Sequence, residues 1–234
     1  MPGYILHLTA AQMYLKSGQS RMNQKQKNNF LIGNLLPDTT KQKEQSHFRN
    51  PKFSEYMVEY PETEWFIQKY KKRLKNSCYL GYLFHLYIDR KFFKEYLPQI
   101  VEFRNQKDEV TVRRKEVSYV YLKRTGEKIL KEDFFSEKYY YGDYTKMNTW
   151  LVNHYQIPME LSIDIPDPGI EEVHYKDIEN VLRELHCYLK VSEDAVKQVK
   201  VFEIKHLLAF LKKAVKEFSV PVNIDCIAIE NIIK

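Results

Sequence analysis

The sequence predicts an all-α protein, a compact helical bundle with additional helices towards the C-terminus. The chain has only seven glycines in 234 residues, so the turns that separate the strands of β proteins are sparse. Several segments place apolar residues at helical spacing, and one of them is apolar on nearly every side. Hydrophobic residues make up 44% of the chain and charged residues 29%, which fits a sizeable buried core.

The N-terminal segment predicts a helix over residues 4–17, with Gly18 as its stop. After a polar loop, the apolar segment 30–38 ends in a turn at Asp38. Pro37 causes this turn, because a proline pushes the residue before it out of helical geometry.

The next segment, residues 39–52, is polar and predicts a loop that contains His47. Residues 62–93 predict one or two helices, amphipathic at first and then nearly all apolar. Residues 105–130 fit a strand or a helix, and their periodicity does not decide between the two.

The C-terminal half begins with a turn and a helix over residues 139–156, with Asp143 near the helix start. The segment "IDIPDPG" at 163–169 carries two prolines and a glycine and is the best linker in the chain. Amphipathic helices are expected after it, over residues 170–190, 192–199 and 201–218. We therefore expect a metal-binding core over 1–160 and a C-terminal helical region over 161–234 packed on it, as one continuous domain.

The net charge limits the kinds of binding partner, and the cysteines indicate the cellular compartment. The net charge of +6 is a mild excess that tolerates an anionic substrate, and we find no specific nucleic-acid motif. The run "KYKKRLK" at 69–75 is either a solvated helix face or a phosphate-facing patch. Three widely spaced cysteines without a CxxC pair, Cys78, Cys187 and Cys226, favour free thiols in a cytoplasmic protein. No signal peptide or membrane span is expected.

Two polar residues interrupt the most hydrophobic segment, "YLGYLFHLYIDRKFF" at 79–93. His85 and Asp89 are four residues apart, so on a helix they share one face. An ionised carboxylate buried alone costs several kcal/mol or more, so Asp89 must be neutralised, paired or bound to a metal. Gly81, one turn before His85, allows another segment to approach closely.

Histidines and an aspartate also occur in or near apolar segments upstream of this helix. His7 lies in an apolar helix, Asp38 follows an apolar run, and His47 stands in the next loop. Imidazole and carboxylate ligands together suit zinc, iron or manganese. Each residue also has a simpler explanation. The histidines can be hydrogen-bonded core residues, Asp38 can cap a turn, and Asp89 can pair with an arginine (Arg49, Arg73 or Arg90).

The order of these motifs resembles the zinc-dependent phospholipase C and single-strand nuclease superfamily, in its short bacterial branch. Members of that family are all-helical and carry an early histidine, a G-x-x-x-PD turn, a histidine in the following loop and a helix with HxxxD. The corresponding motifs here are His7, "GNLLPD" ending in Asp38, "SHF" with His47, and "GYLFHLYID" with His85 and Asp89. They cover roughly residues 1–95.

The resemblance implies a role for each position. Asp38, His47, His85 and Asp89 would hold one zinc ion, and Asp89 would bridge to a second ion that His7 also binds. Asp38 and Asp89 are the catalytic candidates in such a site, where the metal activates a water that attacks a phosphate ester of a phospholipid, nucleotide or other compound. The HxxxE of the family's third metal is absent, which leaves one or two ions.

Asp143 is a further ligand candidate, argued from its own surroundings. A carboxylate in the tyrosine-rich turn "YYYGDYTKMN" either completes the second metal site or acts on substrate. The alternative is a cap for the helix that starts at Tyr144.

Three functional hypotheses follow. The first is a metal-dependent hydrolase of phosphate esters. The second is a helical phosphohydrolase of the HD-domain type, which ranks lower because the chain has no His-Asp dipeptide. The third is a non-catalytic helical protein, in which a structural metal closes the core and the C-terminal part binds a protein partner. The oligomeric state stays open.

Overall fold

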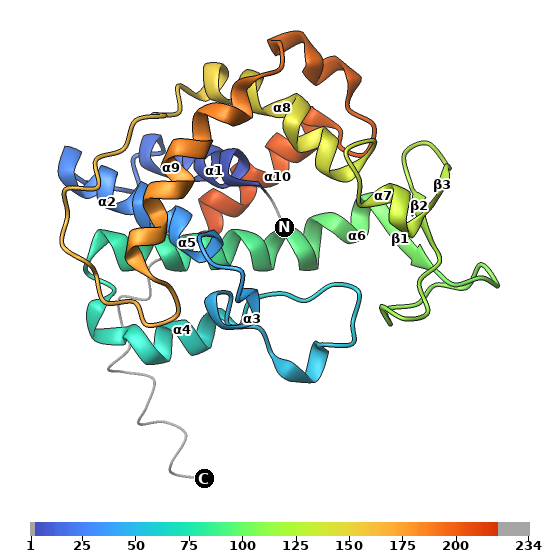
Figure 1. Ribbon diagram of the computed structural model, residues 1–234, viewed down its shortest axis with the longest axis horizontal. Helices are drawn as coiled ribbons and strands as arrows, with labels where there is room; N and C mark the ends of the chain where they lie inside the picture. The colour runs from blue at the N-terminus through green and yellow to red at the C-terminus, as the bar shows by residue number, and fades with distance from the viewer. Residues whose placement is uncertain (1–2, 220–234) are drawn as a thin grey trace.

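Helices build most of the protein, and a small sheet stands at one end (Figure 1). The computed structural model describes residues 3–219. The α-helices are α1 (Tyr4–Lys16), α2 (Gln24–Leu35), α3 (Lys43–Ser46), α4 (Thr63–Tyr70), α5 (Ser77–Lys91), α6 (Leu97–Ile100), α7 (Lys131–Phe134), α8 (Tyr140–Tyr155), α9 (Ile178–Leu185) and α10 (Ile204–Glu217). Short 3-10 helices are η1 (Leu36–Asp38), η2 (Pro51–Phe53), η3 (Lys71–Arg73), η5 (Tyr175–Asp177), η6 (His186–Leu189) and η7 (Glu193–Gln198), and η4 (Phe92–Tyr96) is a π-helical turn.

The all-α prediction is wrong for one segment, because three antiparallel strands form a sheet in the order β1-β2-β3. The strands are β1 (Val101–Arg104), β2 (Tyr119–Leu122) and β3 (Lys128–Leu130). In β2 the buried side chains alternate with partly exposed ones, which is the two-residue period of a strand. This segment was open to either interpretation from the sequence, and the strand is the one that the structure adopts.

The core is centred on the crossing of α2 and α5. A Cβ atom on Gly81 would lie 2.0 Å from the carbonyl oxygen of Phe30, and one on Gly33 would lie 1.9 Å from that of Cys78. Only glycine permits backbones this close, so the close approach predicted at Gly81 is confirmed. Helix α5 buries nearly its whole length, including both of its polar site residues.

Asparagine side chains begin the two helices that cross. The side chain of Asn23 accepts a hydrogen bond from the backbone N–H of Gln26, whose side chain accepts one from the N–H of Asn23 in return. Asn76 caps α5 by accepting from the N–H of Cys78. These caps fix where α2 and α5 begin, and therefore which turn of α5 faces the end of α2.

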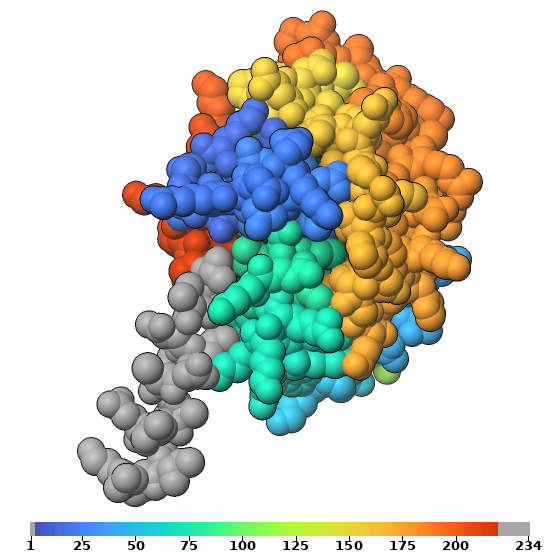
Figure 2. All heavy atoms as spheres, turned by 90° about the vertical axis from the view of Figure 1, so that its left-hand side faces the viewer, coloured from blue at the N-terminus to red at the C-terminus, as the bar shows by residue number. Residues whose placement is uncertain are grey.

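The segment that follows α8 runs over the outside of the N-terminal helices (Figure 2). The hydroxyl of Tyr79 donates to the carbonyl of Pro168, and the backbone N–H of Ser162 donates to the side chain of Asn28. The "IDIPDPG" segment is thus bound to the core along its path. The division at residue 160 stays a prediction.

The expected elements after this segment are found in part. Helix α10 confirms the helix expected over 201–218, and η7 is a 3-10 helix where an amphipathic helix was expected over 192–199. Only the middle of 170–190 is α-helical, as α9. Cys78 is buried and Cys187 exposed, both as free thiols, and Cys226 lies outside the described residues. Among those residues, no helix is both long and apolar enough to cross a bilayer.

Candidate metal centre

Helix α5 places His85 and Asp89 on one face, one turn apart, and both are completely buried. His85 Nδ1 lies 2.8 Å from the carbonyl oxygen of Asn34. A carbonyl can only accept, so Nδ1 carries the proton and Nε2 presents its lone pair. Arg90 does not neutralise Asp89, because its guanidinium donates to Glu62 at 2.7 Å. The partners of Asp89 are histidines.

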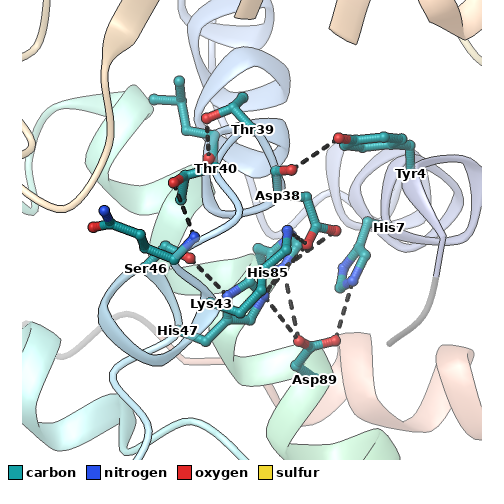
Figure 3. Close-up of polar contacts among 12 residues, drawn as sticks. Tyr4, His7, Asp38, Thr39, Thr40, Lys43, Ser46, His47, His85 and Asp89 are labelled. Atoms are coloured by element: carbon teal, nitrogen blue, oxygen red, sulfur yellow. Dashed lines mark hydrogen bonds and ion pairs between the residues drawn. The ribbon is translucent and has the colours of Figure 1, made fainter. Parts of the chain in front are cut away.

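The end of α2 supplies the next ligand candidate. Helix α2 ends at Leu35, and Leu36–Asp38 continue as the 3-10 helix η1, which turns the Asp38 carboxylate towards α5. The predicted turn at Asp38 is present, but the prediction that Pro37 pushes Leu36 out of helical geometry is wrong, because Leu36 keeps helical dihedral angles (φ −54°, ψ −41°). His85 Nε2 lies 4.0 Å from Asp38 Oδ2. The hydroxyl of Tyr4 donates to the backbone carbonyl of Asp38 at 2.9 Å, which holds this turn against α1 (Figure 3).

The loop after Asp38 brings His47 to the same place. His47 follows the short helix α3 and is buried, although the surrounding sequence is polar. Its Nε2 lies 3.2 Å from Nε2 of His85, 3.4 Å from Asp89 Oδ2 and 3.5 Å from Asp38 Oδ1. Its Nδ1 lies 2.9 Å from the hydroxyl of Ser46, which fixes the ring orientation.

Helix α1 contributes His7 from the opposite side. The rings of His7 and His85 stack with centroids 3.7 Å apart, and His7 Nε2 lies 3.1 Å from Asp89 Oδ1. This contact is not aligned as a hydrogen bond: among the described residues, neither ring nitrogen of His7 and neither oxygen of Asp89 has a hydrogen-bond partner. Buried polar groups are normally paired, so these four atoms indicate a missing ligand.

The five side chains form two overlapping groups of possible metal ligands. One group is His7, His85 and Asp89, and the other is Asp38, His47 and His85. Within each group the ligand atoms lie within 4.8 Å of one another. Asp89 belongs to the first group, but it directs Oδ1 towards His7 and Oδ2 towards His47. Its carboxylate therefore links the first group to the second. Nitrogen and oxygen donors in this arrangement fit zinc.

The electrostatics of the cluster favour an anionic Asp89 and neutral His47 and His85. Burial works against ionisation of Asp89, but His7, His85 and His47 outweigh it and hold the pKa of Asp89 at about 2. Burial lowers the pKa of His47 to about 4, against the opposing effect of the two carboxylates. Burial also lowers the pKa of His85 well below its usual value. At neutral pH Asp89, His47 and His85 therefore offer the deprotonated forms that a metal requires.

The structure does not bring Asp143 together with these five residues. Asp143 lies in the first turn of α8, and both of its oxygens are used elsewhere. They accept hydrogen bonds from the backbone N–H groups of Lys200, Val201 and Phe202 at 2.6–3.2 Å, and Lys146 Nζ lies 3.2 Å from Oδ1. Asp143 therefore leaves the candidate ligand set, and it does not cap α8 either, because it lies inside the helix.

A cavity of about 360 Å³ opens beside the cluster. Of the five candidate ligands, Asp38 is the one that lines it, together with Lys43. The other lining side chains are largely aromatic or polar: Tyr4, Tyr141, Tyr144, Tyr188, Glu137, Thr145 and Asn148. The chain contains 18 tyrosines, four of which line this cavity, whereas no sequence signal pointed to Lys43.

A buried cluster of histidines and aspartates beside a cavity is the kind of site that metal-dependent hydrolases use. Comparison with known proteins agrees. Residues 1–91 match the family model described as zinc dependent phospholipase C, so the resemblance found in the motifs is confirmed. This segment contains all five residues of the cluster. No curated protein and no solved structure matches the chain.

Proposed function

We propose that this protein is a zinc-dependent hydrolase of phosphate esters, of the phospholipase C and nuclease type. The observation that carries the proposal is the convergence of His7, Asp38, His47, His85 and Asp89 beside a cavity. The family match over residues 1–91 supports the reaction class.

The residues present fit the metal. His7 and Asp89 have buried polar atoms without hydrogen bonds among the described residues. The proton on His85 Nδ1 is held by Asn34, which leaves Nε2 free to ligate. Asp38, His47, His85 and Asp89 would hold a first ion, and His7 together with Asp89 would hold a second. Zinc bound by such residues supplies positive charge that acidifies water and stabilises phosphoryl oxygens. Iron or manganese are the alternative ions.

The two carboxylates have different positions and therefore different roles. Asp89 is fully buried, with Oδ1 towards His7 and Oδ2 towards His47, so we propose that it would hold the metal and not contact the substrate. The Asp38 side chain is 8% exposed and lines the cavity, so a water or substrate reaches Asp38 first. We propose that Asp38 would orient the attacking water at the edge of the cavity. Burial raises the pKa of Asp38, but His85, His47 and Lys43 outweigh it and hold the pKa well below its ordinary value, so this carboxylate positions the water rather than accepting its proton.

The cavity limits the part of the substrate that enters. Its volume of about 360 Å³ is at the small end of the range for ligand pockets, so it takes one polar unit of a phospholipid, nucleotide or other ester. Tyrosine rings provide apolar faces for that unit, and their hydroxyls and Asn148 provide polar contacts.

A structural metal site in a non-catalytic protein is the second candidate function. The observation in its favour is the burial of the cluster, in which His7, His47, His85 and Asp89 are each at most 1% exposed. Structural zinc sites are closed, whereas catalytic sites keep a position open to water.

Hydrolysis of bis(p-nitrophenyl) phosphate and of phosphatidylcholine vesicles by the zinc-loaded protein distinguishes the two functions. We expect turnover that is lost in the His85→Ala variant. Stoichiometric zinc with no hydrolysis of any phosphate ester in a broad panel would favour the structural site. As a control, His154→Ala should keep full activity, because His154 stacks on Trp150 on α8 and is not part of the cluster.

A further inference from the structure

The cavity beside the metal cluster carries more negative than positive charge. Asp38 and Glu137 both line it. Among the described residues around this cavity, Lys43 is the only one with a cationic side chain. A phosphate group that enters meets two carboxylates, so a cation within the cavity decides whether the anion is tolerated there.

Lys43 is held close to the cluster by the same short helix that orients His47. The backbone N–H of His47 donates to the carbonyl of Lys43 at 3.0 Å, so the two residues are one helical turn apart. The Lys43 ammonium lies 2.6 Å from Asp38 Oδ1, and His47 Nε2 lies 3.5 Å from the same oxygen. Lys43 thus lies beside Asp38 and the histidines of the cluster (Figure 3), and it also lines the cavity.

The Lys43 ammonium has unused hydrogen-bonding capacity. It carries three N–H donors, and among the described residues its only hydrogen-bond partner is Asp38. Its side chain is 25% exposed, unlike the buried histidines beside it. Two donors therefore remain for a ligand in the cavity, and a bond from an ammonium to a phosphate oxygen is of the strong, charge-assisted kind.

We propose that Lys43 is the anion-binding residue of this site and donates to a non-bridging phosphoryl oxygen of the substrate. The inference rests on the proposed function for the identity of the substrate. It adds a residue that the motifs do not contain. The ammonium offsets the charge of Asp38 and Glu137, and it holds the phosphate next to the carboxylate that faces the cavity.

The test is titration calorimetry of inorganic phosphate into zinc-loaded protein freed of excess zinc. We expect Lys43→Met to weaken phosphate binding by about tenfold or more, which corresponds to the loss of one charge-assisted bond. Lys43→Arg should stay within about threefold of the parent protein, because it keeps the charge. Lys41→Met is the matched control: Lys41 is exposed, lies outside the cavity lining and should have no effect.

Zinc content is measured on every variant. Parent-like phosphate binding by Lys43→Met would overturn the inference, as would absence of phosphate binding by the parent protein. Loss of zinc in Lys43→Met would assign Lys43 to the metal cluster and would also overturn it. If the parent hydrolyses no ester but phosphate binding still depends on Lys43, the proposed function fails and this inference stands.

Discussion

His47 and His85 face each other with their Nε2 atoms 3.2 Å apart, although they come from different elements of the fold. The other ring nitrogen of His85 donates to the backbone, and that of His47 contacts Ser46. Both Nε2 atoms are therefore directed to one small volume, which the oxygens of Asp38 and Asp89 border. A cation in that volume would satisfy all four groups at once.

Replacing Asp89 by asparagine should weaken zinc binding. An amide is a weak ligand and cannot bridge two groups of ligands as a carboxylate can. We expect near-stoichiometric zinc in the parent protein and at least a tenfold lower affinity in Asp89→Asn, measured by plasma mass spectrometry and competition with a chromophoric chelator. Asp133→Asn, at an exposed position, serves as the control. Equal zinc affinity in parent and Asp89→Asn would contradict the proposed ligand set.

Replacing Asp143 by asparagine should lower the stability of the fold and leave zinc binding unchanged. Its buried carboxylate satisfies three successive backbone N–H groups and the charge of Lys146. Asparagine cannot replace all of these contacts, so we expect about 3 kcal/mol less stability in urea unfolding, with zinc content unchanged.

The exposed Asp194, which pairs with Lys197, is the control for Asp143. Asp194→Asn should leave the stability unchanged within the error of the measurement. Loss of zinc in Asp143→Asn without loss of stability would return Asp143 to the metal site.

The stability of the metal-free protein should fall as the pH falls from about 6.5 towards about 4. Burial lowers the pKa of His47 to about 4 in the folded state, and it also lowers that of His85. The unfolded chain binds these protons near pH 6.5, so in this window it holds more protons than the folded protein and is favoured by acid. The depressed pKa of Asp89, about 2, removes further stability only below its ordinary value of about 3.8.

Urea unfolding of chelator-treated protein at pH 7.5, 6 and 5 measures this dependence. Each histidine contributes a slope of up to about 1.4 kcal/mol per pH unit. A His47→Gln, His85→Gln double variant should show a flatter profile in the same window. Equal unfolding midpoints at pH 7.5 and 5 in the parent protein would rule out neutral buried histidines.

Gly81→Ala tests the crossing of α2 and α5 that positions the site. The added methyl group would lie 2.0 Å from the carbonyl oxygen of Phe30, so the helices must separate. We expect a loss of about 3 kcal/mol or more in thermal or urea unfolding, together with weaker zinc binding. Gln68→Ala, at an exposed position of α4, should be close to neutral. Unchanged stability in Gly81→Ala would show that the backbones of α2 and α5 are not in close contact at Gly81.

The sequence by itself determined the helices and the chemistry of the site. Periodicity along the chain predicted α1, α5 and α8, and the cost of burying His85 and Asp89 in an apolar helix marked them as paired or metal-bound. The close approach at Gly81 was also readable, because only a missing side chain permits it. The order of motifs indicated the family, and residues 1–91 match it.

Only the tertiary structure decided which of these groups meet. Asp143 had the same local features as a ligand, yet its partners are the backbone N–H groups of Lys200–Phe202, far along the chain. Lys43 stood in a polar loop without any local signal of function, and the fold placed its ammonium against Asp38 at the cavity that both residues line. The reason is physical: local pattern fixes which face of an element is buried, whereas the identity of the group opposite depends on long-range packing that no short segment encodes.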